Sequence, residues 1–148
     1  MENININFDM DGTLADFYNV PNWLEYLVNS DSTPYEKATP LLRFSSLAKR
    51  LNNLQKKGYK INIVSWLAKN SNPEFDKKVI SAKRKWLETH LKSVSWDNIW
   101  IVPYGEPKYN YCQGENDILF DDEVGNRNSW TGKAYDESCI MEVLSKLN

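Results

Sequence analysis

Four carboxylates stand in two pairs, and each pair directly follows an apolar stretch of the chain. Asp9 and Asp11 follow residues 3–8, in which asparagine alternates with isoleucine and phenylalanine, and Asp121 and Asp122 follow a shorter apolar run. Carboxylates gathered in one crevice repel one another unless a hard cation lies among them, and oxygen ligands with retained waters suit Mg²⁺. The pattern therefore indicates a magnesium site, with the expected ligands Asp9, the main-chain carbonyl of Asp11, Asp121 and Asp122.

The pair Asp9 and Asp11 also suits the hydrolysis of a phosphate monoester. The charged oxygens of such an ester repel a nucleophile, so hydrolysis needs a cation, placed donors and an activated attacking group. Asp9 can attack the phosphorus and form an aspartyl-phosphate, which water then hydrolyses. Asp11 can protonate the leaving oxygen and later accept a proton from that water, provided that neighbouring carboxylates keep its proton affinity high.

Further polar side chains are candidates to stabilise the phosphoryl group. Ser65 follows a predicted buried strand, where its hydroxyl and main-chain amide can donate to a phosphate oxygen. Lys108 can offset negative charge during the transfer, and Lys83 is its alternative because it could reach the same phosphate. A serine in this position is otherwise a common helix N-cap, and most lysines only solvate a surface.

The elements that must position these residues alternate between strand and helix. Apolar runs predict strands at residues 3–8, 59–64, 99–102 and 117–120. Helical spacing predicts helices at residues 41–54, 72–91 and 137–147. Such alternation predicts an α/β fold, a Rossmann-like parallel sheet covered by helices, with ligands beyond the carboxyl ends of the strands. We expect a single domain of residues 1–148, with a small cap insertion at about residues 17–39.

Composition excludes several other classes of protein. A chain of 148 residues has room for one domain, and a formal net charge of −2 provides no general field for nucleic acid or anionic membrane. Two cysteines are too few for a disulfide framework, and no apolar stretch approaches the roughly 20 residues of a membrane span. We therefore expect a cytoplasmic globular protein with free thiols.

The first carboxylate pair belongs to a longer motif. Residues 9–13, Asp-Met-Asp-Gly-Thr, followed by Leu-Ala-Asp-Phe, resemble the first motif of the haloacid dehalogenase (HAD) superfamily. Within it, the chain looks like the 5'-nucleotidases and deoxyribonucleotidases, and residues 83–91 are similar to a helix of the latter. The resemblance implies a HAD-like fold and a magnesium-dependent phosphatase, with Asp9 as nucleophile and Asp11 as acid and base.

The resemblance extends to three later motifs. Ser65 matches the second motif, Lys108 looks like the lysine of the third, and residues 118–122 look like the fourth, whose second aspartate usually binds the metal. We also expect Thr13 and Lys83 to take part in substrate binding. Phe17 matches an aromatic residue that faces the nucleoside, so we expect it to contact the base.

The expected substrate is a small phosphate ester, with a (deoxy)nucleoside monophosphate as the first candidate. Residues 17–39 are shorter than the insertion of the deoxyribonucleotidases, and Trp66 stands where those enzymes carry a small residue. The reaction class therefore transfers better than the substrate. A phosphatase of polynucleotide ends or of another small ester stays open, as does a binding protein without turnover. The basic row at residues 77–85 could guide a polynucleotide end, but a charged helix face is usually just solvated.

Overall fold

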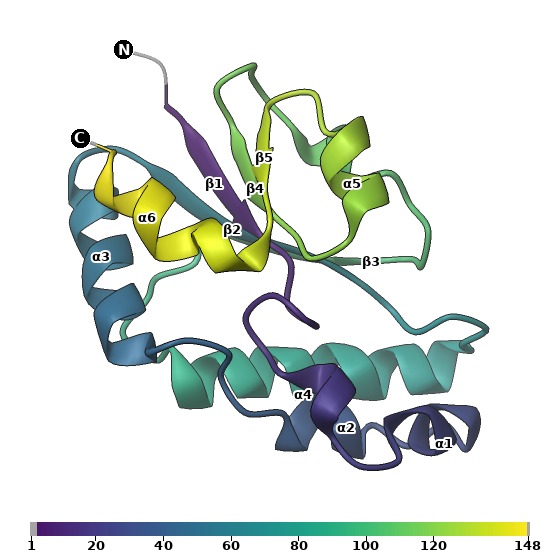
Figure 1. The fold of residues 1–148 in the computed structure, drawn as a ribbon. Coiled ribbons are helices and arrows are strands. Elements are labelled where there is room, and N and C mark those ends of the chain that lie inside the picture. The colour runs from purple at the N-terminus through teal and green to yellow at the C-terminus, as the bar shows by residue number, and fades with distance from the viewer. Residues whose placement is uncertain (1–2, 148) are drawn as a thin grey trace.

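Parallel strands form the centre of the computed structural model, which describes residues 3–147 (Figure 1). Within those residues, one five-stranded sheet has the order β3-β2-β1-β4-β5, and all neighbouring strands pair in parallel. The strands are β1 (Asn5–Phe8), β2 (Lys60–Trp66), β3 (Asn98–Val102), β4 (Ile118–Phe120) and β5 (Lys133–Tyr135). The predicted Rossmann-like α/β architecture is therefore confirmed.

The strand order reverses beside β1. The chain proceeds from β1 through β2 to β3 on one side, and then returns to place β4 and β5 on the other side of β1. In open α/β sheets, a crevice forms at such a reversal, outside the carboxyl ends of the strands. This topology places the loop after β1 next to the loop after β4.

The helices and helical turns connect the strands. They are η1 (Phe17–Asn19), α1 (Trp23–Val28), α2 (Thr33–Lys37), α3 (Phe44–Lys56), α4 (Pro73–His90), η2 (Lys108–Tyr111), α5 (Val124–Ser129), η3 (Glu137–Cys139) and α6 (Ile140–Ser145). The helix predicted at residues 41–54 starts later, and the one predicted at residues 137–147 is split into η3 and α6. The sequence pattern does not predict α5 or β5. Among residues 3–147, no helix combines the length and apolar character needed to cross a bilayer.

One face of the sheet packs against α3, α4 and α6. Ile6 and Phe8 of β1 are fully buried there, together with isoleucines of β2 and β4. Leu47, Leu51 and Leu54 of α3 lie at helical spacing and are buried against them. This apolar layer is the main core of the protein.

The other face of the sheet carries a buried row of asparagines. Asn5 and Asn7 alternate with the apolar residues of β1, so their side chains point away from the main core. The Nδ2 of Asn62 donates to the Oδ1 atoms of both, at 3.2 and 3.1 Å, and the Nδ2 of Asn98 donates to the Oδ1 of Asn62 at 3.1 Å. The Nδ2 of Asn5 donates to the carboxylate of Asp117. The asparagine row therefore satisfies its own buried polar groups across the sheet.

Residues 17–39, the insertion segment, leave the sheet after β1 and form η1, α1 and α2 beside α4 (Figure 1). Phe17 and Tyr35 form a second apolar cluster with Phe75 and Val79 of α4. The helix α4 begins cleanly because Asn72 caps it, accepting a hydrogen bond from the amide of Phe75 at 2.9 Å. The insertion segment thus has its own small core and a rigid helix to pack on.

Candidate active site

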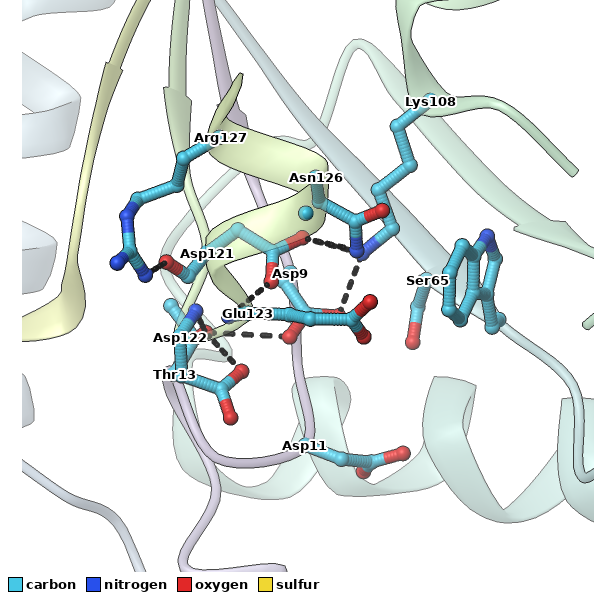
Figure 2. A network of polar contacts seen from close by, with 12 residues as sticks. Asp9, Asp11, Thr13, Ser65, Lys108, Asp121, Asp122, Glu123, Asn126 and Arg127 are labelled. Carbon is cyan, nitrogen blue, oxygen red and sulfur yellow. Dashed lines mark hydrogen bonds and ion pairs between the residues drawn. The ribbon is translucent and has the colours of Figure 1, made fainter. Parts of the chain in front are cut away.

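The polar side chains predicted from the motifs gather at the carboxyl edge of the sheet (Figure 2). Asp9 and Asp11 follow β1, and Asp121 and Asp122 follow β4. The amide of Asp9 donates to the main-chain oxygen of Phe120 at 2.9 Å, which fixes the first loop against the second. Parallel pairing therefore brings together carboxylates more than 100 residues apart in the sequence.

The carboxylate of Asp9 is held between two donors. Its Oδ1 accepts a hydrogen bond from the Nζ of Lys108 at 2.9 Å, and its Oδ2 accepts one from the Oγ1 of Thr13 at 3.1 Å. Asp9 is only 7% exposed. A carboxylate fixed in this way keeps one orientation toward the space in front of the sheet.

Asp121 is occupied by donors of the protein itself. Its Oδ2 accepts hydrogen bonds from Lys108 at 2.7 Å and Asn126 at 3.1 Å, and its Oδ1 accepts one from the amide of Glu123 at 2.9 Å. Burial, followed by the charge of Asp9, raises the pKa of Asp121 to about 6. Burial by itself would lower the pKa of Lys108, but Asp9 and Asp121 outweigh it and raise that pKa.

Asp122 has no cation of its own within the described residues. The hydroxyl of Thr13 lies 3.2 Å from its Oδ1, but this hydroxyl has one proton and also faces Asp9. Burial, followed by the charge of Asp9, raises the pKa of Asp122 to about 8. Asp122 is therefore the carboxylate of the site whose charge is least compensated.

The donor set fits a hard divalent cation. Asp9, Asp121 and Asp122 each offer a carboxylate oxygen, and these oxygens all lie within 4.8 Å of one another. Gly12, at φ 82°, permits the close approach of Asp122, since a Cβ at this position would lie 2.4 Å from its Oδ2. The raised pKa values of Asp121 and Asp122 are the expected response of such a cluster when no cation neutralises it.

Lys83 forms an ion pair with a different carboxylate from those of Lys108. Its Nζ donates to the Oδ2 of Asp11 at 3.0 Å, to the Oγ of Ser65 at 2.6 Å and to the main-chain oxygen of Trp66 at 2.7 Å. Burial raises the pKa of Asp11, and the charge of Lys83 opposes that shift. The two lysines, which the sequence offered as alternatives for one role, therefore both belong to the site.

The buried ion pairs of Lys108 allow a direct test of how the site affects stability. We expect Lys108→Met to lower the free energy of unfolding by about 3 kcal/mol, because two buried carboxylates are then left without their cation. The matched control Lys146→Met removes an exposed pair with Glu142 and should cost well under about 1 kcal/mol. Urea denaturation without divalent cations measures both. Equal losses in the two variants would mean that Lys108 is not the structural cation of this cluster.

A cavity of about 550 Å³ opens in front of the carboxylates and is lined mainly by the insertion segment and the segments that follow β2 and β4. Phe17 belongs to this lining, but it is only 2% exposed, and its ring packs against Tyr18, Trp23 and Tyr35. These contacts are those of a core residue, and the base contact of Phe17 stays a prediction. The neighbouring Tyr18, which is 52% exposed, is the more accessible of the two aromatic residues.

Two groups of residues at the site have no role predicted from the sequence. Asn126 and Arg127 lie on α5, where Asn126 contacts the carboxylate of Asp121 and Arg127 donates to its main-chain oxygen at 3.0 Å. Tyr104 and Lys69 line the cavity from the loops after β3 and β2. Asn126 and Arg127 follow the fourth motif closely in the sequence, but these four residues take their places through loops or a short helix that have no periodic pattern.

No protein-family model matches this sequence, and no curated protein matches it. Among solved structures, the chain is similar to D,D-heptose 1,7-bisphosphate phosphatase from Burkholderia thailandensis, with a TM-score of 0.54. The likeness covers 97% of this chain and 99% of the other, at 11% sequence identity. At this identity, the likeness establishes a shared fold that extends over nearly the whole of both chains.

Proposed function

We propose that this protein is a magnesium-dependent phosphomonoester hydrolase of the HAD superfamily, with Asp9 as its nucleophile. The observation that carries this proposal is the arrangement of Asp9. Its carboxylate lies at the base of a cavity, fixed by Lys108 and Thr13, with Asp11 two residues away. The shared fold of a phosphatase and the motif at residues 9–13 support the same function.

The proposed reaction has two steps. First, a carboxylate oxygen of Asp9 attacks the phosphorus, the bond to the leaving oxygen breaks, and Asp11 gives that oxygen a proton. Water then attacks the phosphorus of the aspartyl-phosphate, Asp11 takes a proton from the water, and inorganic phosphate and free Asp9 are released. The raised pKa of Asp11 suits a group that must hold a proton before the first step.

The other polar residues have supporting roles in this scheme. Lys108 offsets negative charge beside the attacking carboxylate. The Nζ of Lys83 donates to the Oγ of Ser65 at 2.6 Å next to Asp11. Both side chains can donate to a phosphate oxygen there. Thr13 keeps Asp9 aligned and links it to Asp122.

Mg²⁺ would be held by the carboxylates of Asp9 and Asp122 and the main-chain oxygen of Asp11. Asp121 is the less suitable direct ligand, because Lys108, Asn126 and an amide already occupy its oxygens. When bound, the ion supplies positive charge that neutralises the phosphate oxygens and the surrounding carboxylates.

The proposed substrate is a (deoxy)nucleoside monophosphate. Carboxylates line one part of the cavity, and aromatic and apolar side chains, among them Tyr18, Trp23 and Trp66, line the rest. This combination suits a phosphate ester with a flat apolar part. A phosphate-release screen should compare nucleoside monophosphates, sugar phosphates and phosphorylated oligonucleotides, each with Mg²⁺ and with a chelator. Nucleoside monophosphates should be the best substrates. A preference for oligonucleotide ends would favour a polynucleotide phosphatase, and no release from any ester would favour a binding protein.

The role of Asp11 leads to a prediction that depends on the leaving group. With Asp11→Asn, we expect the hydrolysis of an alkyl phosphate to fall by about 10²- to 10⁴-fold, because its leaving oxygen needs a proton. The first step with para-nitrophenyl phosphate should suffer much less, since its leaving group is stable without one. Stopped-flow measurement should therefore show a burst of nitrophenolate followed by slow turnover. Equal losses in the first step for both esters would rule out Asp11 as the acid.

A further inference from the structure

The cavity has two aromatic walls that come from different parts of the chain. Tyr18 and Trp23 of the insertion segment form one wall, with ring centroids 5.2 Å apart. Trp66, at the end of β2, and Tyr104, in the loop after β3, form the other, with ring centroids 5.0 Å apart. The motifs assign no function to this second pair, which we call the Trp66–Tyr104 platform.

The Trp66–Tyr104 platform is fixed directly beside the reacting groups. The Nε1 of Trp66 donates to the main-chain oxygen of Glu106 at 2.8 Å, which ties the ring to the loop that carries Lys108. The Nζ of Lys108 lies 5.3 Å from the centre of the Trp66 ring and 2.9 Å from the Oδ1 of Asp9. Trp66 therefore lies next to the position where the phosphate group of a substrate would bind.

Tyr104 is the outer member of the platform and is open to a ligand. It is 53% exposed although it lines the cavity, and the Nζ of Lys69 lies 5.9 Å from the centre of its ring. A large aromatic side chain left exposed next to a reaction site offers stacking area that the fold itself does not use. A flat, electron-rich group stacked on the exposed part of the Tyr104 ring would also lie close to the positive charge of Lys69.

We propose that the Trp66–Tyr104 platform determines substrate specificity, with Tyr104 stacking on the planar group of the phosphate ester. This inference rests on the proposed function, and it names the substrate class as monoesters whose leaving group carries a flat aromatic ring, such as a nucleobase. Trp66 lies along the part of the substrate next to the phosphorus, and Tyr104 lies along the base. Specificity then comes from loops of the sheet as well as from the insertion segment.

The test compares AMP with ribose 5-phosphate, which carries a hydroxyl group at the C1′ position where AMP carries the base. We expect wild-type protein to prefer AMP, and Tyr104→Ala to lower the ratio of the two kcat/KM values by about tenfold, the size of one stacking contact. The loss should lie mainly in the KM for AMP. Tyr104→Phe should restore the ratio because it keeps the ring. The matched control is Tyr109→Ala, an exposed tyrosine outside the cavity, which should leave the ratio unchanged.

The possible outcomes separate the two proposals. An unchanged ratio in Tyr104→Ala, a wild-type preference for ribose 5-phosphate, or a failure of Tyr104→Phe to restore the ratio would overturn the platform. If wild-type protein releases no phosphate from either ester, the proposed function fails. The affinity for AMP, measured by calorimetry, then tests the role of the platform instead. Tyr104→Ala must then weaken AMP binding by about tenfold, while Tyr109→Ala leaves it unchanged. Equal binding by both variants would overturn the inference.

Discussion

Asp9→Asn is expected to lower turnover by about 10⁴-fold or more while leaving the protein folded. An amide cannot attack phosphorus and form an acyl-phosphate, so the first step loses its nucleophile. The fold should tolerate the change, because asparagine has nearly the same shape and its amide oxygen can still accept from Lys108. Phosphate release under saturating substrate and a thermal melt measure the two effects.

Two further measurements make this expectation specific to Asp9. Acid quenching of wild-type protein during turnover, followed by peptide mass spectrometry, should find a phosphorylated peptide that contains Asp9, and Asp9→Asn should lack it. The matched variant Asp16→Asn changes an aspartate outside the cavity, whose carboxylate accepts a hydrogen bond from the exposed Asn19, and should keep normal activity. Near-normal turnover in Asp9→Asn would refute the nucleophile.

Removal of divalent cations is expected to abolish activity completely, and Mg²⁺ is expected to raise the melting temperature. A ligand that binds only the folded state stabilises it by about 2.7 kcal/mol at one hundred times its dissociation constant. Asp122→Asn should eliminate most of this stabilisation, because it removes the carboxylate whose charge is least compensated. Glu115→Gln, a change at an exposed acidic residue, is the matched control.

The stabilisation by Mg²⁺ should grow with pH. The pKa is raised to about 6 for Asp121 and to about 8 for Asp122, from an ordinary value of 3.8. Without metal, the folded protein therefore binds more protons than the unfolded chain between roughly pH 4 and pH 8, and its stability falls as pH rises through that window. Mg²⁺ competes with those protons, so its effect on the melting temperature should increase from pH 6 to pH 8. Full activity in excess chelator, or a shift independent of both Asp122 and pH, would contradict this metal site.

The sequence alone predicted where those side chains lie that directly follow an apolar strand. Asp9, Asp121 and Asp122 could be placed at one edge of the sheet because parallel strands share that edge, whatever their order. The order itself depends on tertiary packing, and β5 (Lys-Ala-Tyr) lacks the apolar run that indicates the equally short β4. The Asn-Ile alternation of β1 would usually indicate a solvated face, yet here both faces are buried, because the asparagines pair with one another.

The partners of the lysines and aromatic residues could not be predicted. Lys83 and Lys108 have the same chemistry, and only the packing of α4 and η2 assigns one to Asp11 and the other to Asp9. The adjacent residues Phe17 and Tyr18 are both aromatic. The turn η1 directs Phe17 into the apolar cluster with Tyr35 and leaves Tyr18 about half exposed. Such assignments depend on side-chain direction, which spacing along the chain does not determine in an irregular segment.

The asparagine row also makes the sheet intolerant of strand slippage. A shift of β1 by one residue would turn Asn5 and Asn7 into the apolar layer beneath α3 and α6, where their amides would find no partners. Each unpaired buried amide costs about 1–3 kcal/mol, so a slipped chain would not form a stable sheet. The same shift would move Asp9 by about 3.3 Å along the strand and turn its carboxylate to the wrong face. Folding fidelity and the position of the proposed nucleophile therefore depend on the same buried amides.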